Sequence, residues 1–224
     1  MSYLFLWIAI IIAPLDWLAV AFDWRKIEYL AKPAVILALL AWLGMNDGMS
    51  GEMIWFEIGL LFSLIGDICL LFPKKLFIVG LVSFLLTHIA YSIGLNPTLP
   101  PVNIASMILA VLVGITTAQF HNRIAAGLTK KGQENLKIPI LIYAIAISLM
   151  LLSALLTLVR PSWEAFFAIF VSTGAMLFYI SDALIGWNRF VNLIPNGRLF
   201  AMVTYHIGQF GIIVGAALHY LAIE

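Results

Sequence analysis

Charge and cysteine are both scarce in this sequence. Only 10% of the residues are Asp, Glu, Lys or Arg, and the formal net charge is +1. The few basic residues form no basic patch, so no nucleic-acid partner is expected. The single cysteine, Cys69, excludes an intrachain disulfide and a metal site built from several cysteines.

Hydrophobic residues, in contrast, make up 63% of the chain, and the mean hydropathy is +1.07. The apolar runs approach or exceed the ~20 residues that cross a hydrocarbon core about 30 Å thick. The ~10-residue alternating segments of a transmembrane barrel are absent. The first run has no basic segment before it and no convincing cleavage site after it, so we expect a retained helix. The sequence therefore predicts an all-α, polytopic membrane protein.

We expect eight transmembrane helices within a single transmembrane domain that covers residues 1–224. The predicted helices cover residues 3–22, 32–45, 52–72, 76–95, 102–120, 138–159, 162–187 and 199–221. Lys32-Pro33 is interpreted as the start of the second helix, because proline suits a first helical turn. Asn46-Asp47-Gly48 has the composition of a turn, and residues 121–137 form the longest predicted polar loop.

The distribution of basic residues supports this number of helices. Of the 12 Lys and Arg residues, all but Arg160 fall in the loops after the first, third, fifth and seventh predicted helices. The positive-inside rule then places these loops in the cytoplasm and both termini outside. A missing or additional helix would break this asymmetry. The expected location is the cytoplasmic (inner) membrane of a bacterium.

Two short motifs recur in the second half of the chain. Ile65-Gly66-Asp67 is similar to Ile180-Ser181-Asp182, and Thr87-His88-Ile89 is similar to Tyr205-His206-Ile207. Each pair is separated by four predicted helices, an offset that preserves orientation. This pattern predicts two parallel repeats, over residues 1–95 and 102–224. Coincidence between similar apolar segments is the alternative.

Ionisable residues inside the predicted helices are the candidates for function, because such residues are costly in lipid and face the bundle interior. At 1.5 Å per residue, Asp67 and Asp182 each lie about 8 Å from the cytoplasmic end of their helix. By the same measure His206 and Gln209 lie about 12–17 Å deep, and His88 about 20 Å. If their helices face one cavity, these groups line a pocket open to the cytoplasm or the inner leaflet. The alternative is a buried polar pair that only joins two helices.

Two carboxyl groups in one low-dielectric pocket should differ in protonation. Asp67 and Asp182 would then supply a general acid and a general base or electrostatic stabiliser, which suits hydrolysis through an oxocarbenium-like species. His206 or His88 could orient a carboxylate or relay a proton. The residues that could hold a polar head group or water are Tyr91, Ser181, Tyr205 and Gln209. Ordinary interhelical hydrogen bonding is the alternative for the tyrosines and Ser181.

Four short motifs follow one another along the predicted helices. They are Gly66-Asp67, Phe84…His88-Ile89-Ala90-Tyr91, Phe178…Ser181-Asp182 and Tyr205…Gln209, with Lys32-Pro33 before them. In order and spacing this set resembles the YhhN-like lysoplasmalogenase family of integral membrane proteins. The resemblance implies hydrolysis of the vinyl-ether bond of lysoplasmalogens to a fatty aldehyde and a glycerophospho-ethanolamine or -choline.

The resemblance also implies roles for individual residues. Asp67, Asp182 and His206 are expected to be catalytic. The residues expected to bind the lysophospholipid are Lys32, His88, Tyr91, Ser181, Tyr205 and Gln209. An enol ether is hydrolysed by protonation of its β-carbon, which leaves an oxocarbenium ion to which water adds. This chemistry requires a strong acid, a nearby negative charge and a positioned water, and we expect no metal and no organic cofactor.

Two other functions stay open. One is a metal-dependent intramembrane lipid hydrolase, with Zn²⁺ ligands drawn from Asp67, His88, Asp182 and His206, although their spacing is no local metal motif. The other is a proton-coupled transporter, which intramembrane carboxylates and parallel repeats would suit. No helix pair shows the Gly/Pro interruption in both halves that a transport site would favour.

Overall fold

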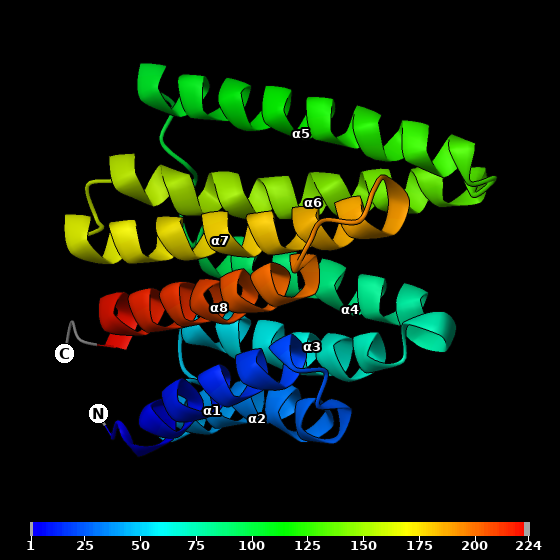
Figure 1. The fold of residues 1–224 in the computed structure, drawn as a ribbon. Helices are drawn as coiled ribbons and strands as arrows, with labels where there is room; N and C mark the ends of the chain where they lie inside the picture. The colour runs from blue at the N-terminus through cyan, green and yellow to red at the C-terminus, as the bar shows by residue number, and fades with distance from the viewer. Residues whose placement is uncertain (1, 222–224) are drawn as a thin grey trace. The chain divides into compact units, whose positions relative to one another are not determined.

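The computed structural model describes residues 2–221, apart from the side chains of Pro73 and Lys74. This part of the chain is all-α (Figure 1). The α-helices are α1 (Leu4–Ala21), α2 (Arg25–Gly44), α3 (Met53–Leu71), α4 (Pro73–Gly94), α5 (Ile104–Lys130), α6 (Lys137–Leu156), α7 (Ala165–Phe190) and α8 (Gly197–Leu221). Among the described residues, eight helices are long and apolar enough to cross a membrane. The predicted fold class is confirmed, and the chain is a multi-pass integral membrane protein.

The chain divides into two compact units. Unit 1 comprises residues 1–97 and 213–224, and unit 2 comprises residues 98–212. Helix α8 contributes to both, since its residues up to Ile212 belong to unit 2 and those from Ile213 belong to unit 1. The parallel repeat over residues 1–95 and 102–224 stays a prediction.

In unit 1, helices that follow one another in sequence pack together: α1 on α2, α2 on α3 and α3 on α4. Two glycines of α3 set the distance to α4. A Cβ atom on Gly59 would lie 2.2 Å from the ring of Tyr91, and one on Gly66 would lie 2.6 Å from the ring of Phe84. Because glycine has no side chain, both aromatic rings lie directly on the backbone of α3.

The C-terminal part of α8 completes unit 1. The hydroxyl of Tyr220 donates a hydrogen bond to the carbonyl oxygen of Gly94 at 2.9 Å, and its ring lies 6.2 Å from that of Phe56. Gly94 ends α4 and Phe56 lies in the first turn of α3. Tyr220 near the end of α8 therefore contacts the C-terminal end of α4 and the N-terminal end of α3, two helices formed much earlier in the sequence.

In unit 2, α6 packs against both α5 and α7. The hydroxyl of Thr117 on α5 lies 2.6 Å from that of Ser148 on α6 and 3.0 Å from that of Tyr179 on α7, so hydroxyl contacts connect these three helices. Helices α7 and α8 approach through their backbones. A Cβ atom on Gly174 would lie 2.5 Å from the backbone nitrogen of Ile212. Such close approach is typical of small residues in membrane helix pairs.

The predicted start of the second helix at Lys32-Pro33 is wrong. Helix α2 begins at Arg25 and contains Pro33. Its first turns are polar, and two of their charges are partnered: the Arg25 guanidinium lies 3.7 Å from the Glu28 carboxylate and 2.9 Å from that of Asp23, just before the helix. Proline costs one backbone hydrogen bond inside a helix, which membrane helices tolerate when neighbouring groups satisfy the freed carbonyl.

The predicted end of the fifth helix at Phe120 is also wrong. Helix α5 continues to Lys130, and Ile124, Gly127 and Leu128 in this extension are buried. Their spacing gives the extension one buried face, so it is an amphipathic continuation beyond the apolar run. The predicted 17-residue loop, 121–137, is reduced to residues 131–133 and a short 3₁₀ turn over Glu134–Leu136. All the other predicted ends lie within three residues of the observed ones.

Candidate functional site

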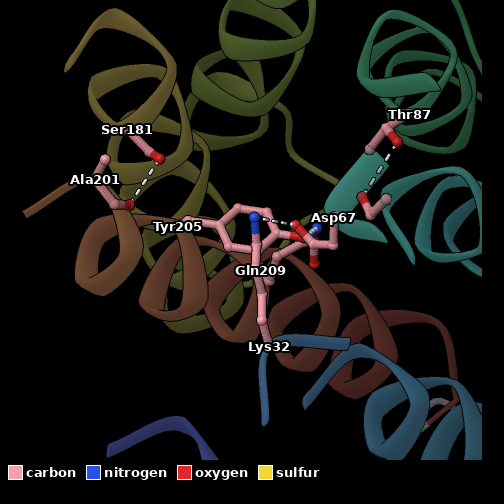
Figure 2. Close-up of polar contacts among 8 residues, drawn as sticks. Lys32, Asp67, Thr87, Ser181, Ala201, Tyr205 and Gln209 are labelled. Atoms are coloured by element: carbon pink, nitrogen blue, oxygen red, sulfur yellow. Dashed lines mark hydrogen bonds and ion pairs between the residues drawn. The ribbon is translucent and has the colours of Figure 1, made fainter. Parts of the chain in front are cut away.

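A buried ion pair joins α2 and α3 in unit 1. The ammonium of Lys32 lies 3.2 Å from Oδ1 of Asp67, and the two side chains are only 8% and 1% exposed (Figure 2). A buried charge is costly unless it is paired, so each of these side chains compensates the other. Lys32 was predicted from the sequence to bind the substrate. That role stays a prediction, and the structure adds a direct contact with the first candidate carboxylate.

Hydroxyl groups connect α3 to α4 close to Asp67 in the sequence. The hydroxyl of Ser63, one turn before Asp67, lies 3.1 Å from that of Thr87. Thr87 also donates a hydrogen bond to the carbonyl oxygen of Gly59 at 3.0 Å. His88 follows Thr87 and is fully buried. Asp67 and His88 therefore lie on two helices that a buried polar contact holds together (Figure 2).

Tyr91 occupies a packing position. Its ring is fully buried, lies against Gly59 and stacks on the ring of Phe56 with the centroids 5.6 Å apart. These contacts give Tyr91 a structural role in the α3–α4 pair. Its predicted part in substrate binding is not tested by them.

The second candidate carboxylate, Asp182, lies on α7 in unit 2. Its Oδ2 atom accepts a hydrogen bond from the hydroxyl of Tyr143 on α6. Tyr143 was not among the site residues predicted from the sequence. Its position within the apolar segment 138–147 was the available signal, because the hydroxyl of a tyrosine in such a segment usually finds a partner.

Four further candidates lie on α7 and α8. Ser181 donates a hydrogen bond to the carbonyl oxygen of Ala201 at 2.8 Å, the interhelical contact considered as its alternative role (Figure 2). The amide of Gln209 lies 3.4 Å from the hydroxyl of Tyr205, one turn before it on α8 (Figure 2). His206 is fully buried beside Tyr205, with the ring centroids 5.3 Å apart. These side chains, like Asp182, belong to unit 2.

Each unit thus contains one of the two candidate carboxylates, and each carboxylate has a defined polar partner. The partner of Asp67 is the cation of Lys32 and that of Asp182 is the neutral hydroxyl of Tyr143. Within residues 2–221, no group of three or more His, Cys, Asp or Glu side chains is close enough to hold a metal ion. The zinc alternative gains no geometric support from this part of the chain.

Comparison with known proteins finds a matching family and several related proteins. A sequence model described as the YhhN family matches residues 27–216. Lysoplasmalogenase TMEM86B of Mus musculus is 27% identical over 196 residues, which cover 87% of this chain and 76% of that protein. A lysoplasmalogenase of Mycobacterium tuberculosis is 31% identical over 165 residues, which cover 70% of this chain and 58% of that protein. Lysoplasmalogenase TMEM86A of Homo sapiens is 27% identical over a region that covers 68% of this chain and 60% of that protein. No solved structure matches the chain.

Proposed function

Because the chain belongs to the YhhN family, we propose that it is a membrane hydrolase that cleaves the vinyl-ether bond of lysoplasmalogens. The products are a fatty aldehyde and a glycerophospho-ethanolamine or -choline. The names of the relatives support the reaction, and the eight apolar helices suit a lipid substrate. The observation that supports the chemistry is the partnering of two intramembrane carboxyl groups, one with a cation and one with a hydroxyl.

The reaction consumes one water. A proton adds to the β-carbon of the vinyl ether, and the α-carbon becomes an oxocarbenium ion. The oxygen of water bonds to the α-carbon and loses a proton to a base. The resulting hemiacetal breaks its bond to the glycerol oxygen, which takes up a proton, and the aldehyde is released. The catalyst must therefore supply an acid, a base and a negative charge near the α-carbon.

We assign the acid to Asp182 and the base to Asp67. The Lys32 ammonium stabilises a negative charge on Asp67, so this carboxylate can take the proton of the attacking water. Asp182 accepts a hydrogen bond from the neutral hydroxyl of Tyr143, which stabilises a negative charge less than the ammonium beside Asp67 does, so we assign the donated proton to Asp182. Once Asp182 has lost this proton, its own charge stabilises the oxocarbenium ion. His206 is assigned to return a proton to Asp182 between turnovers.

The substrate is proposed to enter from the cytoplasmic leaflet of a bacterial inner membrane. The polar residues of unit 2, Ser181, Tyr205 and Gln209, are assigned to the head group or the attacking water. With both termini outside, the basic loops face the cytoplasm and the head group lies on their side. This orientation rests on the distribution of Lys and Arg along the sequence.

The test is incubation of the purified protein with vinyl-ether, alkyl-ether, ester and amide lysolipids, with mass spectrometry of the products. We expect aldehyde from the vinyl ethers alone. Asp67→Asn and Asp182→Asn should each lower the release of aldehyde by at least about 100-fold, the usual loss on removing a general acid or base. Asp47→Asn, in an exposed turn, is the control and should retain full activity.

Folding of each variant is checked by its elution profile in detergent and its helical circular dichroism. Near-normal aldehyde release by both folded variants would defeat the paired-aspartate chemistry. Cleavage of the ester or amide lysolipids without aldehyde release from the vinyl ethers would defeat the proposed substrate.

A further inference from the structure

A cavity of about 300 Å³ lies in unit 2 between the C-terminal ends of α5 and α7. Three cationic residues contribute to its lining: Arg123, Lys130 and Lys131. Trp187 and Asn192 are also among the lining residues, and no carboxylate is. None of these side chains belongs to the catalytic groups assigned above. A cavity lined by cations without an acidic counterpart has the chemistry of an anion site.

The base of this cavity is formed by a close backbone approach. A Cβ atom on Gly127 would lie 2.1 Å from the carbonyl oxygen of Phe190 at the end of α7. The ammonium of Lys131 donates a hydrogen bond to the carbonyl oxygen of Arg189 at 2.7 Å. This contact satisfies one of the carbonyl groups left free at a helix C-terminus and balances its negative dipole. The two helix ends are therefore fixed together, and Lys131 is occupied in holding them.

The other two cations of the cavity lie on α5. Arg123 and Lys130 are exposed, and their separation of seven residues places them on one face of α5, two turns apart. The nearby acid Glu134 is engaged elsewhere, with its carboxylate 3.4 Å from the Lys137 ammonium. Arg123 and Lys130 are thus available to an anion. A guanidinium can bind a phosphate through two parallel hydrogen bonds, and a lysine adds a point charge.

The aromatic member of the lining favours a lipid as the source of this phosphate. Trp187 lies near the end of α7, and its ring contacts that of Phe120 with the centroids 5.9 Å apart. Tryptophans at such positions lie at the level of the head groups, beside the first part of the acyl chains. Basic pockets between transmembrane helices on the cytoplasmic side are suited to anionic head groups.

We propose that this cavity, lined by Arg123, Lys130 and Trp187, binds the phosphate group of an anionic phospholipid of the cytoplasmic leaflet. The bound lipid is a constituent of the bilayer and is not hydrolysed. Its phosphate neutralises the exposed cations at the end of α5, and its acyl chains lie along the apolar part of unit 2. This site is independent of the proposed vinyl-ether hydrolysis.

The test is native mass spectrometry of the whole protein in detergent. Dioleoyl phosphatidylglycerol is titrated in one series, dioleoyl phosphatidylcholine in a second and inorganic phosphate in a third. We expect retained adducts of phosphatidylglycerol only. The double variant R123Q/K130Q should weaken this binding about 10- to 30-fold, from the attraction that each basic residue near the surface contributes to an anionic lipid.

The matched control is Lys137→Gln, which removes a positive charge at the start of α6, outside the lining of the cavity. It should leave the affinity for phosphatidylglycerol unchanged. Weakening by the control that matches, for each charge removed, the weakening by the double variant would overturn the site, because only net charge would then matter. Binding of inorganic phosphate in place of the lipid, lost in R123Q/K130Q, would overturn the assignment to lipid in favour of a soluble phosphate.

Discussion

At the residue scale, the Lys32–Asp67 pair is the most consequential contact in unit 1, because both charges are removed from solvent. Lys32→Met should destabilise the protein by about 3–5 kcal/mol, the cost of leaving one member of a buried pair without the other. The double variant K32M/D67L removes both charges and should recover most of this loss. The measurement is reversible unfolding in mixed micelles.

The chain supplies a matched control for this experiment. Lys137 and Glu134 form a pair at 3.4 Å whose side chains are 37% and 61% exposed. Lys137→Met should change the stability by no more than about 1 kcal/mol, as expected for an exposed pair. If Lys32→Met is as mild as this control, the buried pair does not stabilise the fold.

The sequence identified the candidate side chains by type but not their partners. Asp67, His88 and His206 were recognised because they interrupt apolar runs, and all three are fully buried. The contact of Asp182 with Tyr143 joins residues 39 apart on different helices. Such a pair depends on the rotation of each helix about its axis, which a hydropathy pattern does not specify. The roles assigned to these residues stay predictions.

At the scale of the element, the sequence predicted the number of spans and most of their ends. It failed where a helix continues beyond its apolar run. In α2 the extension carries charges with local partners, and in α5 it buries Ile124 and Leu128 on one face. Hydropathy reports which residues meet lipid, whereas the end of a helix depends on backbone hydrogen bonding. The spacing of Ile124 and Leu128 was the signal that could have revealed the longer α5.

The contact between α7 and α8 gives a second prediction at this scale. Gly174→Ala places a methyl group 2.5 Å from the backbone nitrogen of Ile212 and 2.8 Å from the carbonyl oxygen of Gly208, so the two helices must separate. We expect a loss of about 1–3 kcal/mol in unfolding free energy, as for other overpacked interfaces. The measurement is again unfolding in mixed micelles.

The control is Gly114→Ala on α5, where nothing lies within 4 Å of the added methyl group. It should be neutral or slightly stabilising, since alanine favours a helix over glycine by about 1 kcal/mol. An equal loss in both variants would show that the close approach of α7 and α8 is not the cause.

At the scale of the whole molecule, the distribution of basic residues predicts a topology that can be measured. In a Cys69→Ser background, Leu99→Cys and Asn135→Cys place single thiols in exposed connections before and after α5. We expect a membrane-impermeant maleimide to label the first in intact cells. The second should react only after permeabilisation, because the loop after α5 is predicted to be cytoplasmic. Labelling of both thiols in intact cells would contradict the eight-span orientation.

The family predicted from the ordered motifs is confirmed, and so is the prediction of an enzyme, since the relatives carry the name of an enzymatic activity. The match extends from residue 27 to residue 216 and therefore includes all four motifs. The one motif glycine and the aromatic residue that contacts it acquire a physical explanation. Gly66 is the position where the ring of Phe84 lies on the α3 backbone. In this chain, part of the motif set therefore serves helix packing rather than chemistry.

The way in which α8 completes unit 1 has a consequence for biosynthesis. Tyr220 and Gly94, which its hydroxyl contacts, are 126 residues apart in the chain. At a translation rate of about 5–20 residues per second, the ribosome needs roughly 6–25 s to traverse this interval. During that time the first four spans are already made but lack their final neighbour. A premature stop codon a few residues before Tyr220 would therefore harm the oldest part of the nascent protein, not only its newest.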